Sequence, residues 1–385
     1  MTPLAGVQVL ELTTMITGPL AGMLLADMGA SVIKIENPNK GDPFRSFRDG
    51  LYGGHFIAYN RNKRSLALDL RSEEGMQVFF DLVQRSDVLI DNFRHGVLDR
   101  LGATAERLTA ENPRLIHASI TGFGTEGPYR NRPAYDAVAQ ALSGVSSQFL
   151  DPKIPQVQGP TLSDNITGFY AAYAILSALY ERERTGKGRR VETNMLESTI
   201  AFAPDAFINF KRYGTKVMPT TRAGVSQSFA FRCSDERLIA VHLSSQPKFW
   251  EGLIAATGRD DLSSHSDFVA REQRISNYKA LGAELSKTFA SKPRAEWERL
   301  LEAQDVPFAP VLDVEEVMRD PQVECLGTFY SVQHPQEGDV WGIRPPIRFD
   351  GERPSAIEPP PVLGQHTTEI LAELGYPGNG HESDR

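Results

Sequence analysis

The sequence predicts an α/β fold with a parallel sheet, followed by a smaller second domain. Strand-like and helix-like segments alternate over residues 1–210, starting with a complete β-α-β unit. Such units place two strands in parallel, with the connecting helix on one face of the sheet. From 225 to 310 the pattern changes to a short strand pair followed by charged amphipathic helices. A chain of 385 residues also exceeds the size that one hydrophobic core fills.

The first β-α-β unit lies at the start of the chain. Residues 7–13 alternate and are rich in Val and Leu, and residues 31–36 are predicted to form the second strand. Between them a helix is predicted to open at Gly18 and Pro19, because the first helical turn does not need the N–H that proline lacks. The glycine fingerprint G-x-G-x-x-G is absent here, which argues against a nicotinamide or flavin site.

The later elements follow from the hydrophobic period and the turn residues. In the first part we expect a helix over 73–86, strands over 87–93 and 114–124, a helix reaching Arg182, a strand from 189 and a helix over 195–212. In the second part we expect strands over 228–233 and 237–244 and helices over 277–289 and 295–304. After Val311 the chain is expected to be extended and proline-rich, with a short closing helix over 366–376.

Composition and charge exclude several classes of protein. With 41% hydrophobic and 23% charged residues the chain is typical of a globular protein, and a formal charge of −8 argues against a general nucleic-acid binder. No stretch reaches the ~20 apolar residues that span a bilayer, and no leader pattern opens the sequence, so we expect a cytoplasmic protein. The 2 cysteines and 8 histidines form no metal-binding pattern, so we expect no metal.

One carboxylate, Asp164, stands at the head of an otherwise apolar run, residues 159–176. A helix that is apolar on nearly every side belongs in a protein interior. The simplest interpretation of Asp164 is a helix cap, since an Asp side chain there accepts from free N–H groups and contributes ~1 kcal/mol. The residues alone therefore favour capping, with a catalytic role as the alternative.

Several side chains follow predicted strands. Arg71, Arg94 and Arg100 lie near strand ends, and ligands of open parallel sheets bind beyond the carboxyl ends of the strands. Guanidinium groups there would suit phosphates, which they bind through two parallel hydrogen bonds, although each could equally be a solvated surface charge. Phe93, beside Asn92, could stack on a nucleobase or belong to the core.

Taken together, blocks that cover most of the chain resemble the family III CoA-transferases, the formyl-CoA transferase type also called the CaiB/BaiF family. The blocks occur in the family order, which makes the match far more specific than any one of them. They are "VLELTTMITGPLAGMLLADMGASVIKIENPNKGDPFR", "NRNKRSLALDL", "DVLIDNFRHGVLDRLG", "NPRLIHASITGFGTEGPYRNRPAYDAVAQALSG", "DNITGFYAAYAILSALYERERTGKGRRVETNML" and "PVLGQHTTEIL".

The resemblance implies a large Rossmann-like domain, built from both chain ends, and a small inserted α+β domain. Residues 1–210 would form the N-terminal part of the large CoA-binding domain, 225–310 the small domain, and 311–385 the return to the large domain with a C-terminal tail. It also implies a homodimer whose two chains interlock. No cofactor is expected beyond coenzyme A, which arrives as the acyl-CoA substrate.

The resemblance implies a transfer of CoA from an acyl-CoA donor to a small carboxylic acid acceptor, with Asp164 as the catalytic nucleophile. It puts the adenine and phosphates of CoA at Leu68, Arg71, Asn92, Phe93 and Arg100, with Asn37 and Arg94 among the CoA-binding residues. It puts the pantetheine and the thioester near Met15, Ile16, Thr17, Tyr135 and Asp136.

The chain departs from the formyl-CoA transferase type at three of these positions. That type usually has Gln where Ile16 stands, Arg where Asn37 stands and Lys where Pro133 stands. The differences bear on the specificity for formyl-CoA and oxalate more than on CoA binding.

A further departure is the segment "RAGVSQS", residues 222–228, which replaces a glycine-rich loop that covers the active site in formyl-CoA transferases. Its predicted active-site residues are Arg222, Gly224 and Gln227. Fewer glycines predict a less mobile lid. Arg222 is a candidate to pair with a second carboxylate on the acceptor, or else an exposed loop arginine.

Other functions stay open at this point. An α-methylacyl-CoA racemase of the same fold uses a His–Asp pair, with the histidine in a "GHD" triplet where this sequence has Ala134, Tyr135 and Asp136. Tyrosine is a poor general base near neutral pH, since its ordinary pKa is ~10. A non-catalytic CoA-binding protein would keep the arginines without needing Asp164, and a dehydratase acting on carnitine-like substrates is the remaining alternative.

Overall fold

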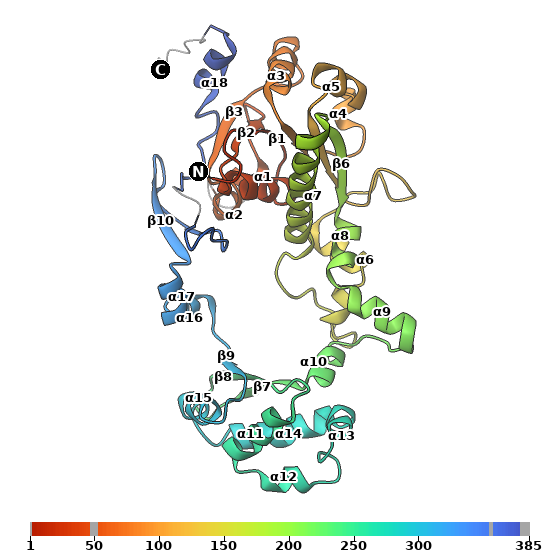
Figure 1. Cartoon of the computed structure of the whole chain (residues 1–385), viewed down its shortest axis with the longest axis vertical. Helices are drawn as coiled ribbons and strands as arrows, with labels where there is room; N and C mark the ends of the chain where they lie inside the picture. Colours follow the sequence, from red (N-terminus) through yellow and green to blue (C-terminus); the bar gives the residue numbers. More distant parts are fainter. Residues whose placement is uncertain (1, 47–52, 354–356, 378–385) are drawn as a thin grey trace. The chain divides into compact units, whose positions relative to one another are not determined.

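The computed structural model describes residues 2–46, 53–353 and 357–377, so the tail predicted after residue 377 lies outside the described residues. The chain divides into two compact units (Figure 1). The first takes in residues 1–146, 157–209 and 327–385, and the second takes in 147–156 and 210–326. The segment 225–310, expected as a small domain, falls within the second unit.

A six-stranded sheet forms the centre of the first unit. Its strands are β1 (Gln8–Leu12), β2 (Ser31–Glu36), β3 (Lys63–Ala67), β4 (Val88–Asp91), β5 (Ile116–Thr121) and β6 (Arg189–Asn194). Their order is β3-β2-β1-β4-β5-β6, and all neighbours run parallel. The predicted parallel sheet is therefore confirmed. The chain leaves the carboxyl ends of β1 and β4 in opposite directions, and such a switch point leaves a crevice in which ligands bind.

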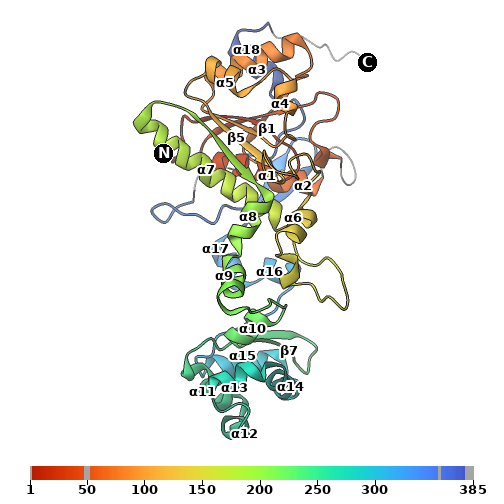
Figure 2. The ribbon, with the colours of Figure 1, turned by 90° about the vertical axis from the view of Figure 1, so that its right-hand side faces the viewer.

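Helices cover both faces of this sheet (Figure 2). On one face lie α1 (Thr17–Asp27) and α7 (Ser163–Thr185), and on the other lie α3 (Glu73–Arg85), α5 (Ala105–Glu111) and α18 (Thr367–Leu374). Because successive strand residues point to opposite faces, Val9 packs with α1 and α7 while Leu10 packs on the other side. The central strands therefore carry apolar residues on both faces, with buried charges such as Glu11 and Lys34 among them.

α7 approaches α1 closely at Gly168. A Cβ atom on Gly168 would lie 2.8 Å from the carbonyl oxygen of Thr17 and 2.9 Å from a methyl group of Leu20. Only glycine leaves room for this approach. The contact brings the first turn of α7, with Asp164, next to the start of α1.

Shorter elements complete the first part of the chain and its return. They are η1 (Pro43–Arg45), α2 (Gly54–Tyr59), α4 (Val97–Arg100), α6 (Asp136–Leu142), η2 (Ser146–Gln148), α8 (Met195–Phe202), α9 (Pro204–Tyr213), and a hairpin of β10 (Phe329–His334) and β11 (Gly338–Ile343). The single helix predicted over 195–212 is wrong, because α8 ends at Phe202 and Pro204 starts α9. A proline cannot continue a helix through its own N–H, but it suits a first helical position.

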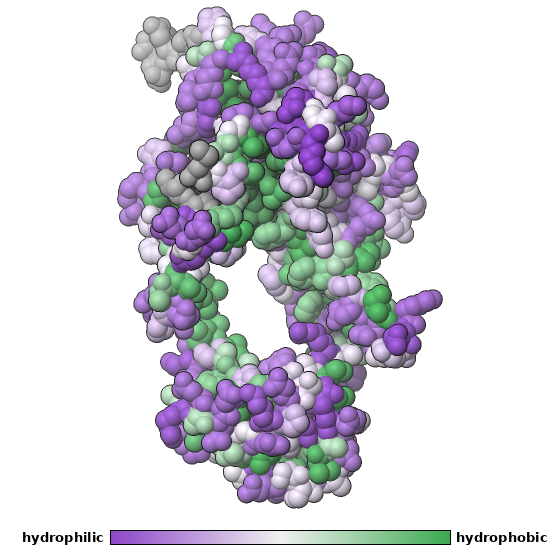
Figure 3. Space-filling view, viewed as in Figure 1, coloured by the Kyte–Doolittle hydropathy of each residue, from purple (hydrophilic) through white to green (hydrophobic). Residues whose placement is uncertain are grey.

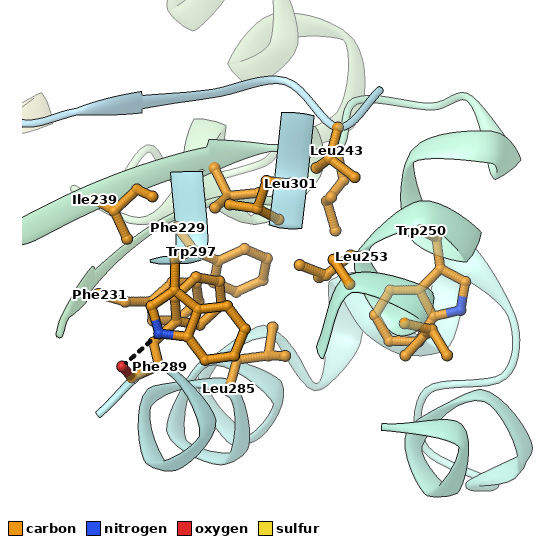
Figure 4. Packing of buried hydrophobic residues seen from close by; sticks show 14 of the residues in the cluster. Phe229, Phe231, Ile239, Leu243, Trp250, Leu253, Leu285, Phe289, Trp297 and Leu301 are labelled. Atoms are coloured by element: carbon orange, nitrogen blue, oxygen red, sulfur yellow. Dashed lines mark hydrogen bonds between the residues drawn. The ribbon is translucent and has the colours of Figure 1, made fainter. Parts of the chain in front are cut away.

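The second unit packs its helices against a small antiparallel sheet, in the order β7-β8-β9. Its elements are α10 (Thr221–Ser226), β7 (Ser228–Arg232), β8 (Leu238–His242), α11 (Pro247–Thr257), α12 (Asp260–Ser264), α13 (Arg271–Ser276), α14 (Tyr278–Phe289), α15 (Arg294–Glu302), β9 (Phe308–Pro310), α16 (Val314–Met318) and α17 (Pro321–Leu326). Figure 4 shows the aromatic side chains packed in its core. The rings of Phe231 and Phe289 stack with their centroids 4.4 Å apart. Trp297 donates its indole N–H to the carbonyl oxygen of Phe289 at 2.8 Å, so this buried polar atom is satisfied.

Two expectations about local structure differ from the structure. The segment 222–228, expected as a loop, is helical as far as Ser226. The hairpin β10–β11 falls in the region after Val311, where only extended segments and a closing helix were expected and no strand pair was predicted. Across the described residues, no helix combines the length and the hydrophobicity needed to cross a membrane, and no three His, Cys, Asp or Glu side chains gather as a metal site would need.

Candidate active site

A pocket of about 250 Å³ opens at the carboxyl ends of β1, β4 and β5, where the sheet order predicts a crevice. It is lined by the β1–α1 loop, the segment after β4, the end of β5, the segment before α6, and the first turn of α7. The predicted site residues that line it are Met15, Ile16, Thr17, Asn92, Phe93, Arg94, Tyr135 and Asp164. The fold therefore brings together residues up to about 150 positions apart in the sequence.

Asp164 is the second residue of α7 and does not cap the helix. Among the described residues no backbone N–H donates to its side chain; instead its own N–H donates to Oδ1 of Asp136 at 3.1 Å. Asp136 begins α6, and its other oxygen accepts from the side-chain amide of Gln140 at 2.5 Å. The capping interpretation is thus not supported, and Asp136 holds the start of α7 against α6.

The pKa of Asp164 is raised to about 7. Burial is the larger cause, because it removes water from the carboxylate, and the nearby negative charge of Asp136 adds to it. A carboxyl group with this pKa changes its charge near neutral pH. Strong perturbation by burial together with a like charge, inside a pocket, is typical of catalytic carboxylates.

Asn92 shapes the loop between β1 and α1 as well as lining the pocket. Its Oδ1 accepts from the N–H of Thr14 at 3.0 Å, and its Nδ2 donates to the carbonyl oxygen of Thr14 at 2.8 Å and to the hydroxyl of Thr17 at 3.2 Å. An asparagine can satisfy a backbone donor and acceptor at once because its amide carries both functions. Asn92 therefore ties the end of β4 to the start of α1.

Three arginines carry positive charge at this pocket: Arg94, Arg130 and Arg132. Among the described residues no carboxylate forms an ion pair with any of them, and Arg132 stacks its guanidinium 3.8 Å from the ring centroid of Tyr129. Sequence reasoning missed Arg130, Arg132 and the lining residue His95. The run "YRNRPAYD" carried a signal, since it puts two cations just before Tyr135.

A second pocket, of about 270 Å³, lies beyond β2 and β3. Asn37, Leu68 and Arg71 line it, and it shares Thr14 and Phe93 with the pocket of Asp164. The two pockets are therefore neighbours, and Phe93 contributes to the lining of both. An elongated ligand with an aromatic or charged end could occupy both.

The other predicted residues lie elsewhere. Arg100, at the end of α4, is exposed and lines neither pocket; its guanidinium lies beside Gly96. In the second unit Arg222 is exposed, Gly224 packs against the Tyr278 ring, and Gln227 is buried, where Oε1 accepts from Arg274 at 2.8 Å. These contacts give Gln227 a structural role within its own unit.

The sequence profile of CoA-transferase family III matches residues 4–367. The chain belongs to this family. This family III CoA-transferase is 34% identical to the acetyl-CoA:oxalate CoA-transferase of Acetobacter aceti, over 97% of the chain and 96% of that relative. It is 32% identical to the succinyl-CoA:glutarate CoA-transferase of Homo sapiens, over 97% of the chain and 86% of that relative. A solved CaiB/BaiF family protein from Brucella suis matches with a TM-score of 0.86 at 33% identity, covering 97% of the chain and 99% of that structure.

Proposed function

We propose that this family III CoA-transferase moves CoA from an acyl-CoA to a free carboxylic acid, with Asp164 as the nucleophile. The observation that carries the proposal is the Asp164 carboxylate, half-buried in the wall of a pocket with its pKa raised to about 7. A carboxylate with a raised pKa is more nucleophilic than one in water, yet still ionises near neutral pH. The relatives named for oxalate and for glutarate support this reaction class.

The first half of the proposed reaction loads the enzyme. The Asp164 carboxylate attacks the thioester carbonyl of the donor, forming a mixed anhydride and expelling the CoA thiolate. The thiolate then attacks the Asp164 side-chain carbonyl, which forms an aspartyl-CoA thioester and releases the donor acid. Each step exchanges one acyl bond for another, so it balances without an oxidant or a reductant.

The second half reverses these steps with the acceptor. The acceptor carboxylate attacks the aspartyl-CoA thioester, giving a new anhydride and free thiolate, and the thiolate takes the acceptor's acyl group. The product acyl-CoA leaves and Asp164 returns as a carboxylate. The guanidinium groups of Arg94, Arg130 and Arg132 would attract the anionic acceptor to a chain whose net charge is −8.

We propose that CoA lies across both pockets. Its nucleotide would occupy the pocket of Leu68 and Arg71, and its thioester would reach Asp164 past Phe93. The shared lining by Thr14 and Phe93 supports this arrangement. Arg71 is exposed and, within the described part of the chain, forms an ion pair with Asp69 alone, at 3.0 Å, so its guanidinium is accessible to a phosphate.

The racemase alternative lacks the group that it needs. Tyr135, at the position of the racemase histidine, is 63% exposed at the rim of the pocket. We expect no deuterium uptake at the α-carbon of 2-methylacyl-CoA in heavy water. Rapid exchange that needs the enzyme would favour a racemase instead.

A transfer screen tests the proposed reaction. Succinyl-CoA, acetyl-CoA and formyl-CoA would each be offered with glutarate and with oxalate, and the CoA products would be identified by mass spectrometry. We expect at least one new acyl-CoA to form with wild-type protein and none with Asp164→Asn, in which an amide replaces the attacking anion. Transfer that proceeds unchanged in Asp164→Asn would contradict the mechanism.

We also propose a homodimer, as the family resemblance implies. The supporting observation is an apolar stripe on α7, formed by Phe169, Tyr173, Leu176 and Tyr180, which are between 40% and 69% exposed. These side chains recur every three or four residues, so they share the face of α7 that points away from the sheet. Figure 3 shows hydrophobic side chains gathered where Figure 1 draws α1, which packs against α7. A second copy of the chain would cover such a face.

A further inference from the structure

Met15 holds an unusual backbone conformation at the edge of the Asp164 pocket. Its φ is +68°, in the left-handed region that few residues other than glycine adopt. Such conformations persist where surrounding groups fix them, and they concentrate at functional sites. The side chains that hydrogen-bond to the Met15 backbone therefore help to shape the wall of the Asp164 pocket.

The Asp42 carboxylate is the group that holds Met15. The N–H of Met15 donates to both carboxylate oxygens, at 3.3 and 3.2 Å. Just before it in the loop, the carbonyl oxygen of Thr13 accepts from Nζ of Lys34 at 2.7 Å, and Lys34 also forms an ion pair with Asp42 at 3.0 Å. One buried ion pair thus fixes the loop at two points.

Asp42 is itself held in place without any contribution from Met15. Its carboxylate accepts from the N–H of Phe44 at 2.9 Å, and its own N–H donates to Glu36 at 3.0 Å. Glu36 in turn pairs with Arg45 at 2.7 Å, and every charged group in this set is 4% exposed or less. These bonds set the position of the Asp42 carboxylate, and the Met15 N–H is directed towards it.

The same residue also belongs to the wall of the other pocket. Asn37, Gly41 and Asp42, at one end of this turn, line the pocket of Leu68 and Arg71. Asp42 therefore contacts the backbone beside Asp164 and faces the space that the proposed function assigns to the CoA nucleotide.

We propose that Asp42 is a positioning residue that couples occupancy of the nucleotide pocket to the β1–α1 loop beside Asp164. The proposal rests on the proposed function for the assignment of that pocket. A nucleotide bound against residues 37–42 restricts this turn, and the restriction reaches Met15 through the carboxylate. Binding energy from the non-reacting end of CoA then orders the reacting end, which is how remote contacts raise kcat.

Hydrogen exchange of the loop amides, read by mass spectrometry, tests this coupling without requiring turnover. Adenosine 3′,5′-bisphosphate is the probe, and calorimetry measures its binding. In the wild type we expect the bound probe to slow exchange over residues 13–17 by about tenfold, and in Asp42→Asn by less than about twofold. The matched control is Asp27→Asn, which breaks another buried ion pair, with Arg61, away from both pockets; it should keep the wild-type response.

A kinetic arm uses succinyl-pantetheine, which lacks the nucleotide, and follows the formation of the Asp164 adduct. We expect the free bisphosphate to accelerate this step by about tenfold in the wild type and not in Asp42→Asn. If the bisphosphate binds to the wild type and hydrogen exchange over residues 13–17 does not change, the coupling is contradicted. This outcome does not depend on whether Asp42→Asn folds. Failure of the probe to bind would overturn it too. A loop response without any Asp164 adduct would instead contradict the proposed function and leave the coupling standing.

Discussion

At the scale of single residues, the raised pKa of Asp164 predicts how activity depends on pH. Since the nucleophile must be ionised, kcat/KM should rise with pH along a limb centred near the pKa of about 7. The transfer rate measured at subsaturating donor from pH 5 to pH 9 checks this. A profile that is flat across that range would contradict the assignment of the attacking group.

The raised pKa of Asp164 also predicts that the stability of the folded protein falls as pH rises, whereas activity rises. Between the ordinary pKa of Asp, 3.8, and about 7, the folded protein holds a proton that the unfolded chain has lost, so stability falls as pH rises through this window. The asparagine in Asp164→Asn cannot ionise, so this variant does not lose stability in that way. Its Tm should exceed that of the wild type by more at pH 8 than at pH 5, and an equal difference at both pH values would show that burial costs this carboxylate nothing.

Arg71 gives a prediction about binding rather than chemistry. Arg71→Ala should raise KM for the acyl-CoA donor about tenfold and leave kcat nearly unchanged, because a phosphate contact far from the thioester stabilises ground and transition states alike. Arg319→Ala is the matched control, since Arg319 is equally exposed and ion-paired, with Glu315, but lines neither pocket. Unchanged KM in Arg71→Ala would remove this arginine from the site.

The sequence predicts candidate site residues, but not how their neighbours in the fold change their properties. Asp164 stood out as a charge heading an apolar run, yet a cap would look the same. What distinguishes them is Asp136, 28 residues away, which accepts the N–H of Asp164 and adds a negative charge beside it. Arg130 and Arg132 line the pocket because the segment before α6 lies against the end of β5. The sequence does not show this contact.

At the scale of elements, the contact of α1 with α7 depends on Gly168. Gly168→Ala should destabilise the fold by about 1–3 kcal/mol, because its Cβ would meet the carbonyl oxygen of Thr17. Activity should fall as well, since Thr17 and Asp164 line one pocket from these two helices. Gly282→Ala is the control: it is also mid-helix, in α14, but its Cβ would find ordinary contacts at 3.6 Å. Thermal unfolding of both variants tests this prediction. Equal Tm values for Gly168→Ala and Gly282→Ala would contradict the role of the close contact between α1 and α7.

Elements with a clear period were predictable, and those set by single residues or distant partners were not. The strand over 31–36 matches β2 residue for residue because Val32, Ile33 and Ile35 are β-branched and favour a strand. Pro204 was overlooked as the break between α8 and α9. The hairpin β10–β11 was missed because its strands are half exposed and follow no strong alternation, so only pairing with each other defines them.

At the scale of the whole molecule, the exposed stripe on α7 predicts the assembly. Sedimentation of the wild type should give a dimer, and the pair Tyr173→Glu with Leu176→Glu should shift it towards monomer, since two charges on the stripe oppose burial. Val314→Glu, a change at another exposed apolar residue, in α16, should leave the dimer intact. A wild type that sediments as a monomer at all concentrations would contradict the proposed assembly.

The parallel sheet could be predicted from alternating segments, but its strand order could not. The order depends on the side of β1 on which each following strand is added, and the local sequence pattern does not indicate that side. The family resemblance supplied only the expectation of a Rossmann-like domain built from both chain ends. The interlocking of two chains stays a prediction that only the assembly can test.

The most direct test of the central claim is to map the covalent intermediate. Wild-type protein would be incubated with the acyl-CoA donor identified by the transfer screen and no acceptor, then analysed intact and as peptides by mass spectrometry. We predict an acyl or CoA adduct that hydroxylamine removes, carried by the peptide containing Asp164 and absent from Asp164→Asn. An adduct on another residue would contradict the account. So would an Asp164→Asn variant that still transfers CoA although it forms no adduct.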